Sequence, residues 1–315
     1  MPRVTIVHRT TYHYARPVRF GDHRLMLRPR DSHDLRLVSA TLTTTPPARL
    51  RWKHGVFGNS IAIASFDDES DVLEFVSTIA LEHYPAAPLD VASLIEPYAE
   101  THPFAYAAEE ADDLAPYLRR HDSDPERTVD LWAKSFLNTE GPTRTAELLA
   151  AITRAIKADF AYEAREEEGT RPAPETLARR SGACRDFALL MMEACRSLGI
   201  AARFVSGYLY DDRLIGSENP MVGGGATHAW CDVYVPGAGW VEFDPTNGLL
   251  AGRNLIRVAV TRTPEQAVPV SGSFIGGAGD FQGLAVSVDV TVAALPGEVV
   301  SATAERADSD QAAPA

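Results

Sequence analysis

The sequence predicts an α+β protein, in which an N-terminal β-sandwich precedes a core of helices packed on an antiparallel sheet. Three observations predict this fold class. Short runs of alternating polarity, broken by Pro, Gly and Asp, fill the first part of the chain. An apolar pattern with helical spacing begins directly after Cys184, and two strand-like runs joined by a turn begin at His228. At 315 residues the chain is also long enough for two domains.

Residues 1–85 are expected to form the β-sandwich. Two extended runs each carry residues of one parity, and such residues face the same side of a strand. The first run contributes Val4, Ile6, His8, Thr10, Tyr12 and Tyr14, and the second contributes Leu35, Leu37, Ser39, Thr41 and Thr43.

Residues 86–142 are rich in Ala, Pro and acidic residues and are expected to form a helical connector. A short helix is expected from Val91 to Glu96, where Pro97 stops it, and a longer one from Val129 to Phe136.

Residues 143–300 are expected to form the core and its returning strands. The first core helix carries apolar residues at helical spacing from Leu148 to Ile156. Two later β-like runs, Asn254 to Thr261 and Leu284 to Ala293, either finish the core sheet or return to the sandwich. Residues 301–315 contain no large apolar residue and are expected to be disordered.

Cys184 is the candidate nucleophile of the core. It is followed by apolar residues on one helical face, so it is expected at a helix N-terminus. Unpaired N–H groups and the positive end of the helix dipole favour a thiolate there, and they offer an N–H to a developing oxyanion. Gly182, just before it, would let a substrate backbone approach. The face consists of Phe187, Leu190, Met191, Ala194 and Leu198.

His228 and Asp244 are the candidate base and orienting group. His228 is the only histidine after His121, and it opens a strand-like run that ends at a Pro-Gly-Ala-Gly turn. Asp244 closes the next strand-like run. If these strands pair antiparallel, both side chains can lie on one face of the sheet. Nucleophile, base and orienting group would then complete a catalytic set.

Simpler interpretations exist for each of these residues. A cysteine is often a small core residue, which is the interpretation we favour for Cys195 and Cys231. His228 alone would fit a hydrogen-bonded core histidine, and Asp244 before a proline would fit the cap of a turn.

The core motifs resemble the bacterial transglutaminase-like superfamily. The matching segments are SGACRDFALLMMEACRSLGIAARFVSGY and THAWCDVYVPGAGWVEFDPTNG, within about residues 143 to 260. Members of this superfamily share a papain-like core with a Cys-His-Asp triad. The resemblance therefore implies a papain-like, transglutaminase-like core, with Cys184 as nucleophile, His228 as general base and acid, and Asp244 as the group that holds the imidazole.

The N-terminal part resembles the bacterial transglutaminase-like N-terminal domain. The matching pieces are Tyr12-His13-Tyr14 with Pro17-Val18, Leu25 to Pro29, and Phe57-Gly58-Asn59. The resemblance implies no chemistry for this domain.

Further residues are candidates for the oxyanion hole and the cleft. Tyr162 resembles the aromatic motif that family members carry upstream of the nucleophile, and a buried tyrosine that closes the core is an equal alternative. Ser206 and Tyr208, on the strand after the nucleophile helix, are candidates to line the cleft. The run Gly223-Gly224-Gly225 is a candidate lid hinge.

The expected reaction is cleavage of an amide through a thioester. Release by water makes the protein a cysteine peptidase or amidase, which we favour because the resemblance is to bacterial members regarded as cysteine peptidases. Release by an amine makes it a transglutaminase, and a peptide-maturation amidase is a further alternative. A non-catalytic peptide-binding module is the alternative from another class. The expected partner is a peptide or protein amide substrate, and no cofactor or metal is expected.

Composition and charge indicate where the protein is located and which partners it binds. The three cysteines suggest no disulfide framework, and no apolar run suits a membrane span or a signal peptide, so a cytoplasmic location is expected. Residues 1–55 hold 11 Lys and Arg against 3 Asp and Glu, although the whole chain carries a net charge of −13. We expect this basic segment to pack on the acidic remainder. The alternative is a basic surface for an acidic peptide or partner. Nucleic acid is not an expected partner, and the sequence does not predict the oligomeric state.

Overall fold

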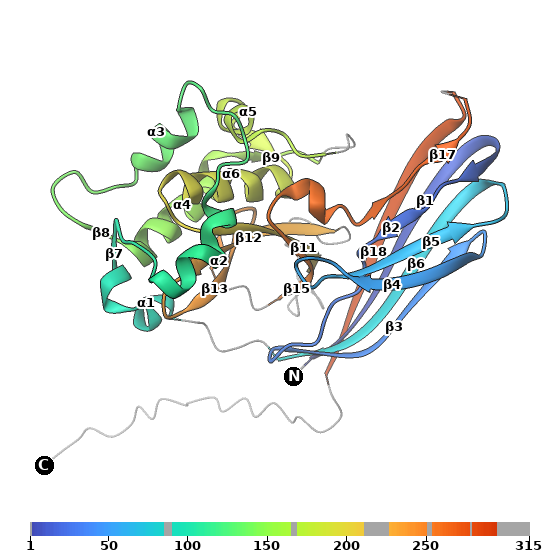
Figure 1. Cartoon of the computed structure of the whole chain (residues 1–315), viewed down its shortest axis with the longest axis horizontal. Coiled ribbons are helices and arrows are strands. Elements are labelled where there is room, and N and C mark those ends of the chain that lie inside the picture. Colours follow the sequence, from blue (N-terminus) through green and yellow to red (C-terminus); the bar gives the residue numbers. More distant parts are fainter. Residues whose placement is uncertain are drawn as a thin grey trace, which may run out of the picture.

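The computed structural model describes residues 2–84, 90–164, 169–210, 227–250, 254–277 and 279–294. The predicted α+β class is confirmed, with an antiparallel sandwich beside a core that carries the helices (Figure 1). Two segments with sequence predictions, the glycine run at 223–225 and the tail at 301–315, lie outside the described residues. No helix in the described ranges is both long enough and apolar enough to span a membrane.

Two antiparallel sheets form the sandwich in the described part of the chain. The larger has the order β17-β1-β6-β3, with β18 also paired to β1, and the smaller has the order β16-β2-β5-β4. Their facing side chains form an apolar interior that includes Phe20, Leu73 and Phe75. The strands are β1 (Pro2–Phe20), β2 (His23–Leu25), β3 (Leu35–Thr45), β4 (Ala48–His54), β5 (Ser60–Phe66), β6 (Ser70–His83), β16 (Val270–Ser271), β17 (Phe274–Ile275) and β18 (Phe281–Ala294).

The two late β-like runs go to different places. The run at 254–261 forms β15, which joins the core sheet beside β11. The run at 284–293 lies within β18, which pairs antiparallel with β1 from Pro2↔Ala294 to Tyr14↔Phe281. In Figure 1 the orange-red β18 accordingly lies next to the blue β1. The sandwich thus includes strands from both ends of the chain.

The core is an antiparallel sheet covered on one face by helix α6. Its strand order is β14-β13-β12-β11-β15. Ala229, Cys231 and Val233 of β12 alternate toward the buried residues of α6, which include Leu190 and Ala194. The strands are β11 (Ala202–Leu209), β12 (His228–Val235), β13 (Gly239–Asp244), β14 (Leu249–Leu250) and β15 (Leu255–Thr261), and the helix is α6 (Cys184–Ser197).

The remaining helices surround α6. The expected connector helices are present as α1 and α3, and the first core helix is α4. The sequence did not predict α2 and α5: α2 carries an internal proline, Pro116, and the seven residues of α5 are too few to show a clear apolar period. The elements are α1 (Val91–Leu94), η1 (Pro97–Ala99), β7 (Thr101–His102), α2 (Ala108–Leu118), α3 (Thr128–Lys134), β8 (Thr143–Arg144), α4 (Thr145–Asp159), β9 (Ala161–Tyr162), α5 (Ala173–Arg179), β10 (Ser181–Gly182) and η3 (Pro264–Ala267).

The sandwich and the core share one long buried face. The inward residues of β6 contact the smaller sheet near Phe75, and farther along the strand, near Ile79, they contact Tyr208 and Ile256 of the core. Two histidine–tyrosine hydrogen bonds cross this contact, from His8 Nδ1 to the Tyr208 hydroxyl (2.9 Å) and from His83 Nδ1 to the Tyr210 hydroxyl (2.7 Å).

The ion pair across this contact has the opposite polarity to the expected one, in which basic sandwich residues would pair with acidic core residues. Arg257 of the core pairs with Asp34 of the sandwich at 2.6 Å. Within the described residues, the arginines of the sandwich that form ion pairs do so with carboxylates of the sandwich itself or of the returning segment. The pairs are Arg3–Glu82, Arg9–Glu74, Arg16–Asp280, Arg19–Glu69, Arg36–Glu82 and Arg49–Asp67. Within the described residues, the ion pair across this contact is therefore formed by a basic residue of the core and an acidic residue of the sandwich, beside apolar packing.

Candidate active site

Cys184 is the first residue of α6, as its sequence setting predicted. The two residues of β10, Ser181 and Gly182, lead into the helix and pair in parallel with β9, so that Gly182 lies opposite Tyr162. Cys184 is 7% exposed. Its thiol therefore lies beside helix N–H groups that have no acceptor within the helix.

Asp186 holds the turn that precedes the nucleophile. Its carboxylate accepts hydrogen bonds from the backbone N–H of Ala183 (2.9 Å) and of Arg171 (2.7 Å). A Cβ added at Gly182 would lie 2.9 Å from the Asp186 Cβ and 3.3 Å from the Phe187 ring. The glycine is thus required so that Asp186 can fold back over the helix start. The packing explains Gly182 without the substrate contact suggested by the sequence.

His228 and Asp244 meet as the antiparallel pairing predicted. Strands β12 and β13 pair up to Cys231↔Phe243, which places Asp244 on the same face as His228 and Trp230. His228 Nε2 and Asp244 Oδ2 are 2.8 Å apart, and both side chains are fully buried.

The turn after β13 fixes the carboxylate of Asp244. Its Oδ1 accepts the backbone N–H groups of Thr246 (3.0 Å) and Asn247 (3.3 Å). Its Oδ2 accepts the side-chain amide of Asn247 at 2.8 Å in addition to His228. Burial alone would raise the pKa of Asp244, but the imidazole and these donors outweigh burial and lower it. Asp244 is thereby held as a carboxylate.

The charge of Asp244 sets the protonation of His228. Burial alone would lower the pKa of His228, but the Asp244 carboxylate outweighs burial, the Cys184 sulfur adds to it, and together they raise the pKa to about 10. Because Nε2 is directed to Asp244, the ring nitrogen left for Cys184 is Nδ1. Nδ1 is buried and has no hydrogen-bond partner of normal geometry within the described residues, although the Cys184 side chain contributes to the raised pKa of His228. The imidazole is therefore oriented and charged, with one nitrogen free for the thiol or a substrate.

Tyr162 lies next to the nucleophile. It stands on β9, opposite Gly182, and its side chain is 41% exposed. Partial burial and then the nearby Cys184 sulfur raise the pKa of Tyr162, which places its hydroxyl within electrostatic range of that sulfur. Exposure and position make it available to a bound substrate.

Ser206 and Tyr208 occupy different surroundings. Ser206 is buried on β11, in register with Ala229 and Ala259, both of which belong to the core cluster beneath α6. Tyr208 is 1% exposed, and its hydroxyl is bonded to His8 of the sandwich. The prediction that Tyr208 lines the cleft is wrong, because the sandwich covers this end of the strand.

Trp230 and Asn247 were not singled out by the sequence. The ring of Trp230 stacks near that of His228, with centroids 6.2 Å apart and an angle of 28° between the planes. Two signals were present: Trp230 has the same parity as His228 on one strand, and Asn247 lies in the Pro-Thr-Asn-Gly turn after Asp244.

The arrangement brings a thiol, an imidazole and a carboxylate together, and the described residues form no metal cluster. No group of three or more His, Cys, Asp or Glu side chains in that part of the chain is placed to hold a metal ion. The candidate nucleophile, the charged imidazole and the carboxylate that orients it come from α6, β12 and β13, whose relative positions are fixed by the apolar core.

Comparisons with known proteins find two family matches, several relatives and a shared fold. The profile of the transglutaminase-like superfamily matches residues 132–245, and that of the bacterial transglutaminase-like N-terminal region matches residues 4–82. The uncharacterized proteins Mb2599c of Mycobacterium bovis and Rv2569c of Mycobacterium tuberculosis are each 31% identical over 285 residues, which cover 86% of this chain and 87% of theirs. A solved structure described as a putative cysteine protease from Cytophaga hutchinsonii shares the fold, with a TM-score of 0.70 and 19% identity over 94% of this chain and 92% of that chain.

Proposed function

Because this chain belongs to the transglutaminase-like superfamily and carries the bacterial N-terminal region of that family, we propose that it is a cysteine-dependent hydrolase of amide or peptide bonds. The observation that carries the proposal is the 2.8 Å hydrogen bond between His228 and Asp244, beside a cysteine at the first position of a buried helix. Cys184, His228 and Asp244 would supply the nucleophile, the base and the orienting group that thiol acyl transfer needs.

In the proposed reaction, the Cys184 thiolate attacks the amide carbonyl carbon and forms a tetrahedral oxyanion. Backbone N–H groups at the start of α6 stabilise that oxyanion, and Tyr162 is the candidate second donor. His228 Nδ1 gives its proton to the leaving amine as the C–N bond breaks, which leaves a thioester on Cys184. His228 then takes a proton from water, the resulting hydroxide attacks the thioester, and the acid is released with the thiolate restored.

Water and an amine compete for the same thioester. Hydrolysis is the favoured outcome, and it agrees with the description of the Cytophaga hutchinsonii protein. Transfer to an amine or maturation of a defined peptide amide would use the same residues. The proposed substrate is a peptide or protein amide, and the proposed location is a reducing cytoplasm that keeps Cys184 free.

The first test is the pH dependence of alkylation. The full chain and a His228→Ala variant are treated with iodoacetamide from about pH 5 to about pH 9, and the labelled cysteine is located by peptide mass. An ordinary thiol reacts roughly 75-fold faster at about pH 8 than at about pH 6, following its thiolate fraction. Cys184 is expected to be labelled rapidly even at about pH 6, because a charged imidazole lies beside it, and labelling is expected to slow in the His228→Ala variant.

The protein contains its own control cysteines. Cys195 and Cys231 are fully buried, and burial raises the pKa of both thiols, that of Cys195 to about 12. They are expected to stay unlabelled in the folded protein. An ordinary pH profile at Cys184, unchanged in His228→Ala, would count against the proposal and favour a non-catalytic binding module.

Turnover separates the chemical alternatives. A fluorogenic peptide amide is incubated with the protein in the presence and absence of a primary amine such as putrescine. Release of the free acid that putrescine does not suppress supports hydrolysis. A putrescine conjugate formed as the main product would identify a transglutaminase, and a Cys184→Ala variant should form neither product.

A further inference from the structure

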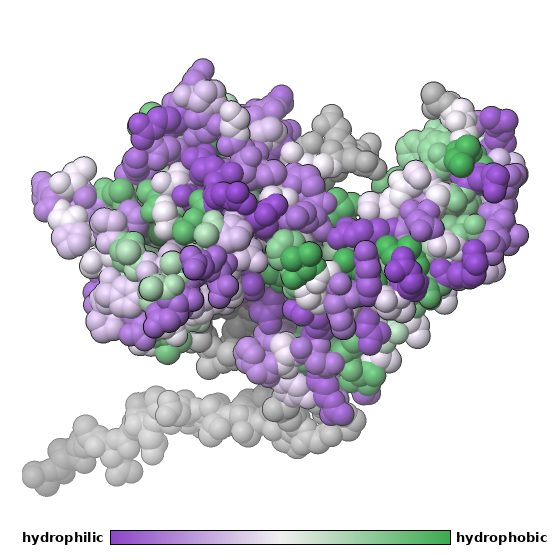
Figure 2. Space-filling model, in the orientation of Figure 1, coloured by the Kyte–Doolittle hydropathy of each residue, from purple (hydrophilic) through white to green (hydrophobic). Residues whose placement is uncertain are grey.

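Strand β4 is an edge strand with both faces exposed. It lies at the end of the smaller sandwich sheet and pairs only with β5 among the described strands. Every residue from Arg49 to His54 is exposed, including Leu50 at 37% and Trp52 at 46%. Figure 2 shows hydrophobic patches among the hydrophilic surface of the sandwich. An unpaired strand edge is a template for another extended chain.

Three of the positive charges at or beside this edge have no carboxylate partner within the described chain. Arg49 pairs with Asp67, but no ion pair is formed there by Arg28, Arg51 or Lys53. The register places Arg51 opposite Ile63 and Lys53 opposite Ile61. Ile61 and Ile63 pack on the catalytic core, so the two cations lie on the sheet face that turns toward the core.

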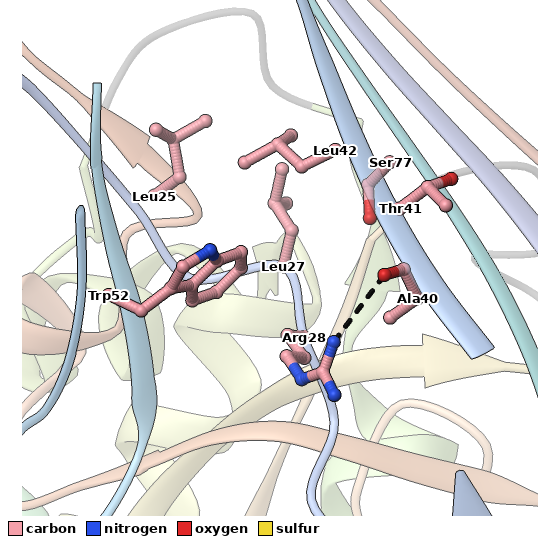
Figure 3. A pocket seen from close by; sticks show the side chains of 8 residues that line it. All are labelled: Leu25, Leu27, Arg28, Ala40, Thr41, Leu42, Trp52 and Ser77. Atoms are coloured by element: carbon pink, nitrogen blue, oxygen red, sulfur yellow. Dashed lines mark hydrogen bonds between the residues drawn. The ribbon is translucent and has the colours of Figure 1, made fainter. Parts of the chain in front are cut away.

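An apolar groove lies on the other face of the same strand. Trp52 projects from β4 toward Leu27, and Leu42 of β3 stands on the opposite wall (Figure 3). Arg28 lies at one end of this groove, where its guanidinium donates to the carbonyl oxygen of Ala40 at 3.4 Å and lies 5.8 Å from the centre of the Trp52 ring. Its lining combines apolar residues with three polar ones: Leu25, Leu27, Ala40, Leu42 and Trp52 with Arg28, Thr41 and Ser77.

A second hollow continues the groove around the edge of β4. It has a volume of about 300 Å³ and is lined by Arg28, Trp52, Lys53, His54 and Ser60. Three of these five residues are basic types and none is acidic. Arg28 and Trp52 line both hollows, so the apolar groove and the cationic rim form one continuous surface.

We propose that the edge of β4 binds an extended peptide segment of the substrate protein, in which carboxylate and apolar side chains alternate. Alternation follows from strand geometry, since neighbouring side chains of an added strand point to opposite faces. The carboxylates would meet Arg51 and Lys53, and the apolar side chains would pack against Trp52 at the mouth of the groove. That the segment belongs to the substrate rests on the proposed function; the binding itself does not.

A peptide fits this surface better than a single-stranded nucleic acid does. Nucleic-acid strands are bound by successive aromatic side chains on which bases stack. Here one exposed aromatic residue, Trp52, stands beside a row of backbone N–H and C=O groups, which pair with a peptide backbone. The edge therefore offers hydrogen bonds that a peptide uses and a base stack does not.

Binding is measured with a short fluorescein-labelled peptide in which glutamate and leucine alternate. The full chain carries Cys184→Ala, so that the probe is not cleaved, and fluorescence anisotropy reports the dissociation constant. An Arg51→Glu/Lys53→Glu double variant is expected to weaken binding by about tenfold or more, since two attractions become repulsions. Trp52→Ala is expected to weaken it by a similar factor through the apolar contact. Added salt should weaken binding to the unmodified edge.

The matched control reverses two charges elsewhere. Arg154→Glu/Lys157→Glu changes exposed residues of α4 by the same total charge and should leave the dissociation constant within about twofold. Equal weakening in both double variants would overturn the proposal. So would equal binding of a peptide with glutamine in place of glutamate, or tighter binding of a labelled oligothymidine.

Turnover distinguishes this proposal from the proposed function. With the catalytic cysteine intact, Arg51→Glu/Lys53→Glu should hydrolyse a small fluorogenic amide at the normal rate. It should show a KM about tenfold higher when the acidic, apolar segment is attached to that amide. Peptide binding without any amide turnover would support the docking surface and contradict the hydrolase. Turnover with an unchanged KM for the extended substrate would contradict the docking surface alone.

Discussion

His8 makes the contact between the sandwich and the core sensitive to acid. Its side chain is 1% exposed, and its ring nitrogens are bonded to the Tyr208 hydroxyl at 2.9 Å and to Thr10 Oγ1 at 3.1 Å. Burial lowers the pKa of His8 from 6.5 to about 4. The folded protein therefore holds His8 neutral at a pH where the unfolded chain has already taken up a proton.

The sign and size of the effect follow from that difference. The unfolded state binds more protons between the two pKa values, so the contribution to stability is complete above pH 6.5 and is lost as the pH falls toward 4. At about pH 5 the loss corresponds to about 1.5 pH units at 1.36 kcal/mol each, or about 2 kcal/mol.

The test compares the full chain with a His8→Gln variant, whose side chain stays neutral. Urea unfolding is followed by tryptophan fluorescence at about pH 7.5 and about pH 5, and the free energy of unfolding is extrapolated to water. The natural protein should lose about 2 kcal/mol more than the variant on acidification. Subtracting the loss of the variant from that of the natural protein removes the contributions of the other titrating groups. One of these is His83, whose pKa burial also lowers to about 4.

His13 provides the matched control on the same strand. It is exposed, so His13→Gln should lose stability on acidification as the natural protein does. If His8→Gln also lost as much as the natural protein, the neutral, buried state inferred for His8 would be refuted. The buried histidine would then not account for any acid sensitivity of the contact.

Three further substitutions test the candidate active site. Asp244→Asn removes the charge that keeps His228 protonated, so alkylation of Cys184 at about pH 6 should slow by at least ~10-fold, measured with iodoacetamide; an unchanged rate would contradict the charged pair. Tyr162→Phe should lower kcat on a fluorogenic amide by ~10², and normal kcat would exclude its hydroxyl as an oxyanion donor. Gly182→Ala should lower the free energy of unfolding by about 1–3 kcal/mol, since the added Cβ meets Asp186, and an unchanged urea midpoint would show that the turn adapts.

Much of the candidate site followed from local patterns. The apolar spacing after Cys184 predicted α6, and the turn at 236–239 predicted the antiparallel pair β12 and β13. Residue parity then placed His228 and Asp244 on one face. These inferences needed only the periods of a helix and a strand and the chemistry of three side chains.

Tyr208 shows why the rest could not be predicted. It has the same parity as Ser206, so the pattern assigns both to one face of β11. Two different elements cover that face: α6 lies over the part near Phe204, and the sandwich lies over the part near Tyr208. The parity of a residue predicts the face to which its side chain points. It does not predict what covers that face, because the partner of Tyr208, His8, lies two hundred positions away in the sequence.

Gly207 lies between Ser206 and Tyr208 on β11, directly opposite His228 in the sheet. A Cβ there would approach the carbonyl oxygen of Ile256 to 2.0 Å and the ring of Trp230 to 2.9 Å. Ile256 packs on the sandwich, and Trp230 stacks on the imidazole of His228. The absence of a side chain at this position lets β15 and Trp230 close on β11 together. The close packing of β15 and Trp230 on β11 therefore supports the position of His228, and a side chain at residue 207 would disturb it.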